Sequence, residues 1–154
     1  MEIELITTGT ELLLGRVLNT HQQWIGQRLA DSGYTLSRQV TVPDTGPAIR
    51  EAVQTALGRA RLVITTGGLG PTSDDITRGL IADLLARPVG RDESIVSHIE
   101  SFFARRNRPI PESVLVQAQV PKGAVVIPNE HGTAPGLAIE VSPNTFHETG
   151  IPAW

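Results

Sequence analysis

Residues 62–75, with the sequence LVITTGGLGPTSDD, decide the fold class of this chain. Residues 62–66 form a continuous apolar and β-branched run, which is typical of a strand covered on both faces. A glycine-rich loop follows the run, and apolar residues at helical spacing between positions 80 and 85 follow the loop. The stretch therefore predicts a central strand, a glycine loop and a helix, in that order.

The same alternation of strand and helix is found before this stretch. Thr20 and Gln23 match a capping box, and Gly33 suits the left-handed backbone that ends a helix, so one helix is expected between them. Alternation of strands and helices predicts an α/β fold with a mainly parallel sheet and helices on both faces. The other expected elements are strands at 3–8 and 34–42 and a helix with the apolar stripe Ile49, Ala52, Val53, Ala56 and Leu57.

The second half of the chain has shorter elements. A helix is indicated by the spacing of Ile95, Ile99 and the pair Phe102 and Phe103, and these aromatic residues, like Trp24, are expected in the core. A short helix is expected at 109–119, and two short strands at 124–127 and 137–141. Residues 142–154 show little pattern. With no internal repeat or linker, we expect residues 1–154 to form a single domain.

Composition limits the classes of protein to which the chain can belong. The sequence has 154 residues, a net charge of −3, 40% hydrophobic residues and no cysteine. These values favour a globular protein and exclude a disulfide scaffold, a thiolate metal site and a cysteine nucleophile. The acidic balance argues against a nucleic-acid partner, and no apolar run is long enough to cross a membrane. The acidic start at residues 1–4 is unlike a secretory signal, so we expect a cytoplasmic protein.

Three loops after expected strands combine threonine with glycine. In parallel α/β sheets ligands bind beyond the carboxyl ends of the strands, and glycines let backbone N–H groups approach a phosphate. The alternative for the middle loop is a tight turn in which Asp74 caps the next helix. The candidate ligand-binding residues are Thr8 and Gly9; Thr66, Gly67, Gly68, Gly70, Thr72 and Ser73; and Gly132, Thr133 and Gly136.

Carboxylates accompany two of these loops and the loop after residue 42. Asp74 and Asp75 are adjacent at the expected start of a helix, where oxygen ligands can hold Mg²⁺ beside phosphate. Glu11 and Asp44 follow other strands and are expected at the same edge of the sheet. The alternatives are that Asp44 caps the helix near Pro47 and that Glu11 is a solvated loop residue.

Other kinds of chemistry find little support in the sequence. The four histidines lack the spacing of metal ligands, and no G-x-S-x-G motif is present. We therefore expect the histidines to make surface or local hydrogen bonds. The run Arg105–Arg108 is interpreted as a solvated helix end, with an anion site as the alternative.

Several motifs together resemble one known family. They are GTELLLG at 9–15, VPD at 42–44, TTGGLGPTSDDIT at 65–77, PN at 128–129 and GTAPG at 132–136. In this order they resemble the N-terminal domain of the competence/damage-inducible CinA proteins, which belongs to the molybdopterin-binding superfamily. The resemblance implies a three-layer α/β/α sandwich with a mostly parallel sheet.

The resemblance also implies an activity and its alternatives. The first is divalent-metal-dependent hydrolysis, most readily with Mg²⁺, of ADP-ribose-like nucleotides to AMP and ribose 5-phosphate. The alternatives are binding of molybdopterin or a nucleotide without turnover, and adenylyl transfer to molybdopterin. Asp44 and Asp75 would be catalytic, Asp44, Asp75 and Glu11 would hold the metal, and the threonines and glycines above would bind the ligand.

The resemblance further implies a longer chain than this one. Similar proteins continue past the position of Trp154 into another apolar strand, a Gly-Pro-Pro loop and commonly a domain linked to nicotinamide mononucleotide deamidation. We therefore expect the chain to lack its last strand and a deamidase domain. A sheet edge left open in this way favours association, so a homo-oligomer is expected.

Overall fold

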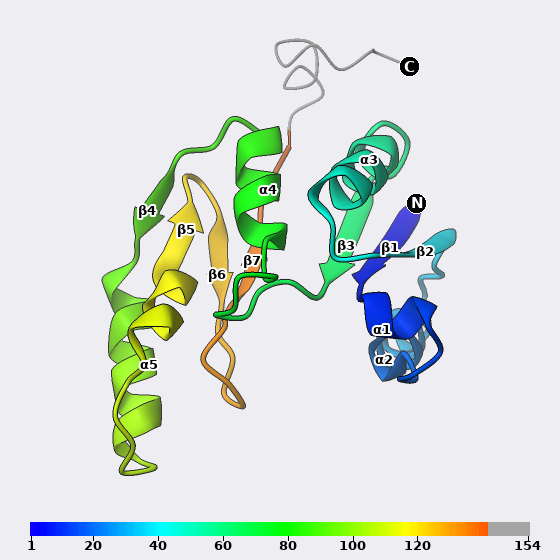
Figure 1. Ribbon diagram of the computed structural model, residues 1–154. Coiled ribbons are helices and arrows are strands. Elements are labelled where there is room, and N and C mark those ends of the chain that lie inside the picture. The colour runs from blue at the N-terminus through cyan, green and yellow to red at the C-terminus, as the bar shows by residue number, and fades with distance from the viewer. Residues whose placement is uncertain (142–154) are drawn as a thin grey trace. The chain divides into compact units, whose positions relative to one another are not determined.

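The computed structural model describes residues 1–141, which divide into two compact units, residues 1–68 and residues 69–141 (Figure 1). The patternless tail expected at residues 142–154 lies outside the described residues. The expectation of a single domain over the whole chain stays a prediction. None of the helices in the described part has the length and hydrophobicity that a membrane span requires.

The first unit is built on a parallel sheet, as the sequence predicts. The strand order is β2-β1-β3, and β1 pairs in parallel with both neighbours. The expected helix stripe is confirmed, since Ile49, Val53 and Ala56 are buried. The elements are β1 (Ile3–Thr8), α1 (Thr10–Leu13), α2 (Thr20–Asp31), β2 (Arg38–Val42), α3 (Gly46–Leu57) and β3 (Leu62–Thr66).

The central strand of this sheet is β1, and the prediction that residues 62–66 form it is wrong. All six residues of β1 are buried, whereas Leu62 in β3 is 39% exposed. The burial of β1 is hard to predict from the sequence because the strand contains three polar residues, Glu4, Thr7 and Thr8, all of which are buried. A buried position can hold a polar side chain when a partner compensates it.

The helix α2 differs from expectation in its cap and in its burial. Its N-cap is Asn19, whose side chain accepts a hydrogen bond from the N–H of Gln22, so the capping box at Thr20 is wrong. Trp24 is 60% exposed, with the guanidinium of Arg28 over its ring at 5.4 Å, so it is not a core residue. The left-handed residue that follows the helix is Gly33, as predicted, with φ +79°.

The second unit combines two helices with two antiparallel strand pairs. The strands β4 and β5 pair with each other, as do β6 and β7. Neither β4 nor β5 was expected, because three residues are too few to show a period. The helix expected at 109–119 is a short 3₁₀ helix. The elements are α4 (Thr77–Leu84), β4 (Val89–Arg91), α5 (Glu93–Ala104), the 3₁₀ helix η1 (Glu112–Ala118), β5 (Gln119–Pro121), β6 (Val125–Ile127) and β7 (Gly136–Ala138).

The core of the second unit lies between α5 and η1. Ile95, Val96 and Ile99 of α5 are buried together with residues of η1, which confirms the predicted stripe. The two phenylalanines are only half-buried, so the core prediction is correct for them in part. Phe103 packs against the buried cluster, while Phe102 lies under the guanidinium of Arg106 at 3.6 Å. Arg106 thus shields an aromatic face at the helix end.

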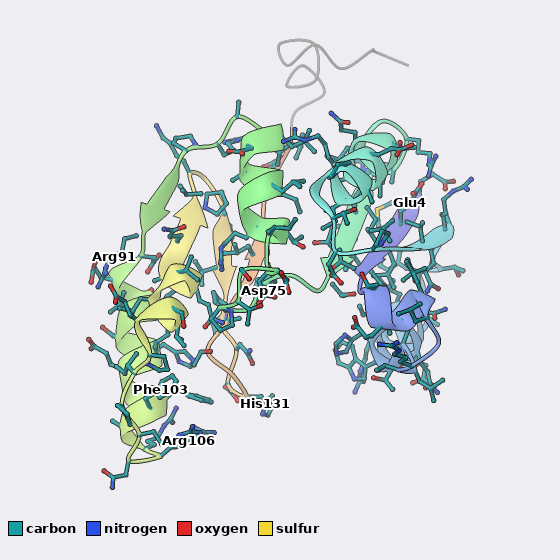
Figure 2. The ribbon with its side chains drawn as sticks, viewed as in Figure 1. Glu4, Asp75, Arg91, Phe103, Arg106 and His131 are labelled. Carbon is teal, nitrogen blue, oxygen red and sulfur yellow. The ribbon has the colours of Figure 1, made fainter. Side chains whose placement is uncertain are left out.

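An ion pair with the exposed Arg59 compensates the buried charge of Glu4 in β1. Glu4 is 3% exposed and accepts hydrogen bonds from Nε and Nη2 of Arg59, which follows α3, and Arg38 of β2 lies 3.9 Å away (Figure 2). The bonds from Arg59 hold the pKa of Glu4 below its ordinary value, against the opposing effect of burial. The pair therefore joins the centre of the sheet to the segment after α3.

We expect Glu4→Gln to destabilise the protein by about 2 kcal/mol, because the buried side chain loses its charge-assisted hydrogen bonds from Arg59. The pKa of Glu4 is lower in the folded state, so its stabilising effect is complete above the ordinary pKa. The effect is lost as the pH falls through the folded-state value. Urea denaturation from pH 7 to pH 3 should show the difference between wild type and variant shrinking with acid. The exposed pair Arg91–Glu93 provides the control, since Glu93→Gln should change stability little at any of these pH values.

Candidate functional site

The loops after the three parallel strands are tied together at one edge of the first unit. The N–H of Gly9, just after β1, donates to the carbonyl of Val42 at the end of β2, at 3.0 Å. On the other side, the hydroxyl of Thr8 donates to the carbonyl of Thr66 at 3.5 Å. These contacts confirm that the loops after residues 8, 42 and 66 meet at one sheet edge.

Asp44 is held by the loop after β1. Its Oδ2 accepts a hydrogen bond from the N–H of Thr10 at 2.8 Å, and its own N–H donates to the hydroxyl of Thr10 at 3.3 Å. The alternative that Asp44 caps the following helix is wrong, because the N-cap of α3 is Thr45, which makes no side-chain cap bond. Glu11 is exposed in α1. Asp44 therefore fixes the position of one loop relative to another.

Position 67 requires glycine, because its backbone conformation and its close contact with Thr8 exclude a side chain. Its φ is +99°, and a Cβ there would lie 2.7 Å from the carbonyl oxygen of Thr8 and collide with the Thr8 hydroxyl. Gly68 also has a positive φ, +67°. Because both residues lack side chains, the backbone after β3 can lie directly against the end of β1.

We expect Gly67→Ala to destabilise the protein by about 2 kcal/mol or more, because both the backbone conformation and the contact with Thr8 exclude a methyl group. The matched control is Gly79→Ala in α4, where a Cβ would meet nothing within 4 Å. That change should leave stability unchanged or raise it by up to about 1 kcal/mol, since alanine favours helix. Thermal denaturation of both variants measures the difference. Equal effects would contradict the steric argument.

In the second unit, the loop before α4 folds around the carboxylate of Asp75 (Figure 2). Oδ2 of Asp75 accepts hydrogen bonds from the N–H of Thr72 at 2.9 Å and from its hydroxyl at 2.5 Å. A Cβ on Gly70 would collide with this carboxylate. The prediction that Asp74 caps the helix is wrong, because the N-cap is Ile76 and has no side-chain cap bond. Asp75 thus gives the loop its shape.

The charge of Asp75 is stabilised by its surroundings. Partial burial raises the pKa of Asp75, but the hydrogen bonds from Thr72 and Gly70 and the positive charge of Arg78 together lower it below its ordinary value. Arg78 is 7% exposed, and burial lowers the pKa of its guanidinium. Asp75 is therefore ionised at neutral pH.

We expect Asp75→Ala to destabilise the protein by about 1 to 2 kcal/mol, because two charge-assisted hydrogen bonds in a half-exposed loop are lost. Asp74→Ala should change stability by less than about 0.5 kcal/mol, since Asp74 is exposed and, among the described residues, its carboxylate accepts a hydrogen bond only from the hydroxyl of Ser73, at 3.5 Å. Urea denaturation at pH 7 compares the neighbours. A larger loss of stability from Asp74→Ala than from Asp75→Ala would contradict this assignment.

The third candidate loop joins β6 and β7. Nδ2 of Asn129 donates to the carbonyl of Ala134 at 2.9 Å, and its Oδ1 accepts from the N–H of His131 at 3.0 Å. Nε2 of His98, on α5, lies 2.9 Å from the carbonyl oxygen of Gly132, as expected for a histidine with a local hydrogen bond. The loop that contains Thr133 and leads into Gly136, the first residue of β7, is therefore held by side chains as well as by the strands.

Comparison with known proteins identifies the family. The family described as "Probable molybdopterin binding domain" matches residues 4–151. The chain belongs to this family. It is 47% identical over 142 residues to the CinA-like protein of Akkermansia muciniphila, covering 92% of this chain and 34% of that protein. The chain spans about a third of the length of the curated relatives it matches.

Solved structures of the family agree with this assignment. A crystal structure of CinA from Thermoplasma acidophilum, described as having unknown function, has a TM-score of 0.80 at 34% identity, over 91% of this chain and 82% of that one. The molybdopterin biosynthesis enzyme MoaB from Thermus thermophilus shares the fold, with a TM-score of 0.53 at 20% identity over 78% of each chain. The resemblance to CinA proteins and the predicted α/β fold of the molybdopterin-binding superfamily are therefore confirmed.

Each of the two loop aspartates, Asp44 and Asp75, offers one carboxylate to a metal ion within its own unit. Within residues 1–141, no three histidines, aspartates or glutamates gather into a group that would hold a metal ion. Oδ2 of Asp44 and Oδ2 of Asp75 already accept hydrogen bonds from their own loops. Mg²⁺ in proteins is commonly held by one or two carboxylates together with the phosphates of a substrate. Taken within its own unit, each of the two carboxylates would supply a single protein ligand to an ion that is otherwise held by phosphate oxygens.

Sequence reasoning missed several residues that hold these loops. Thr10, the partner of Asp44, is not among the predicted site residues. Nδ2 of Asn19 donates to the hydroxyl of Thr7 at 3.1 Å. The position of Asn19 just before a helix is the feature of the sequence that could have predicted a structural role for it. Arg78 gave no signal, because an arginine in the first turn of a helix is expected to be solvated. Ser73, placed among the ligand-binding candidates, is exposed beside Asp74.

Proposed function

We propose that this chain is a binding module for a small phosphorylated pterin or nucleotide. The observation that supports this most is the close approach of Gly67 to Thr8, which places two residues without side chains at the carboxyl edge of a parallel sheet. This is where ligands bind in open α/β sheets. A pterin ligand is suggested by the family description and by the biosynthetic relative MoaB.

The polar groups at this edge suit a phosphate or a pterin. The hydroxyl oxygen of Thr66 is buried and has no hydrogen-bond partner among the described residues. A buried hydroxyl without a partner is costly, and an acceptor on a ligand would satisfy it. The glycine backbone beside it can approach the ligand without steric hindrance.

A second candidate function, hydrolysis of ADP-ribose, has one observation in its favour. Among the described residues, the carboxylate of Asp44 accepts its hydrogen bond from the N–H of Thr10 through Oδ2, which leaves Oδ1 outside that bond. Such an oxygen can orient a water molecule or ligate a cation. The reaction adds water across the pyrophosphate bond and gives AMP and ribose 5-phosphate. Mg²⁺ would neutralise charge on the phosphates when bound.

We expect thermal denaturation to separate these two functions when ADP-ribose, AMP or a pterin phosphate is added with and without Mg²⁺. A ligand at about 100 times its Kd adds about 2.7 kcal/mol to the stability of the folded state, which is a rise in Tm of roughly 5 to 10 °C for a chain of this size. Binding without turnover gives this rise and no AMP in the same samples by mass spectrometry.

The outcomes are distinct. AMP formed from ADP-ribose only with the metal, and lost in Asp44→Asn or in Asp75→Asn, would establish the hydrolase. Stabilisation without AMP supports the binding module. If none of the three ligands shifts the Tm of a folded sample, the proposed function is wrong.

A further inference from the structure

The end of α1 and the turn that joins it to α2 expose four large apolar side chains in the first unit (Figure 1). The exposed fractions are 52% for Leu13, 58% for Leu14, 54% for Val17 and 85% for Leu18. Two of these residues belong to the GTELLLG motif, and the proposed function does not use them. Single exposed apolar residues are common on proteins, whereas a group of large ones within six residues is typical of an interaction surface.

The backbone of this turn does not require apolar side chains. The N–H of Arg16 donates to the carbonyl of Glu11 at 3.0 Å, and this bond closes the turn through the main chain. Gly15 has a φ of +68°, and a Cβ there would meet nothing within 4 Å, so the turn lies in open space. Exposed turns are usually built from small and polar residues. The four apolar side chains are therefore available to a partner.

The same turn carries one charge of each sign. Glu11 and Arg16 are both exposed, and the main-chain hydrogen bond between them places them side by side. Within residues 1–141, neither takes part in a salt bridge. The carboxylate of Glu11 lies beside Gly9, where a Cβ would be 2.8 Å from Oε1. We call the four apolar residues together with Glu11 and Arg16 the turn surface.

We propose that the turn surface is the interface with a second copy of this chain, related to the first by a two-fold axis. In such a dimer the same surface meets itself, so it must be self-complementary. The apolar side chains of the two copies cover each other, and Arg16 of each copy pairs with Glu11 of the other. A purely apolar partner would leave both charges unpaired, and a ligand with charge of one sign would pair with only one of them.

The size of the turn surface suits the centre of an interface. A standard interface buries about 800 Å² on each partner, with an apolar core and a polar rim. The four apolar side chains supply the core, and the exposed polar residues 20–23, next along the chain, supply part of the rim. This dimer differs from the oligomer expected from an open sheet edge, since no strand takes part in it. It also does not depend on the ligand of the proposed function.

The test is sedimentation velocity of the whole chain over a concentration range of about 1 to 100 μM, where a moderate self-association is visible. The wild type should shift from monomer to dimer. Leu18→Glu places like charges in the apolar core, so the Kd of self-association should rise by about tenfold or more. The control is Val125→Glu, which adds the same charge at a residue of β6 that is 66% exposed and should leave the Kd unchanged. Circular dichroism checks that each variant is folded.

A charge exchange decides whether the partner is a second copy. Glu11→Arg alone and Arg16→Glu alone each bring like charges together across the two-fold axis, so each should weaken the dimer. The variant with both changes has the pair with its signs reversed, so it should recover dimerisation. A wild type that is monomeric throughout the range would refute the inference. So would a dimer that Leu18→Glu leaves intact, or one that both single charge changes weaken and the double change fails to recover.

Discussion

The parallel pairing of β1 with β2 and β3 is the constraint on which the first unit depends. The register sets Thr8 opposite Val42 on one side and Thr7 opposite Thr66 on the other, so all three strands end together. The three loops that follow must then share a small region. Hydrogen bonds between main chains, and a glycine where a side chain would collide, are what that crowding requires. The hydrogen bonds from Arg59 to the buried Glu4 also hold β1 in place.

The order of elements in the first unit could be predicted because each element has its own local pattern. The apolar stripe of α3 and the glycine after α2 depend on helical period and backbone conformation, which neighbours in sequence determine. Which strand is central could not be predicted in this way. Residues 62–66 form a continuous apolar run and were expected at the centre, whereas β1 contains the charged residue Glu4. The burial of Glu4 depends on Arg59, which is distant in sequence.

The candidate site illustrates the same limit. Residue types identified the loops that contain Asp44 and Asp75, but not which atoms these carboxylates contact. A helix cap was the alternative role for Asp44 and for Asp74, because aspartate favours that position. In the structure, Asp44 instead contacts Thr10, which is 34 residues away, and Asp75 contacts a residue of its own loop. Membership of the family could be predicted because it depends on the order of several motifs, not on any one contact.

The difference in sequence separation between these two aspartate contacts has a consequence for the order of folding. The contact of Asp75 with Thr72 spans three residues, so this loop can close on a timescale of about 100 ns or less, before any sheet exists. The contact of Asp44 with Thr10 joins residues 34 apart in sequence and depends on the pairing of β1 with β2. We therefore expect the glycine loop of the second unit to take its shape before the strand-end loops of the first unit.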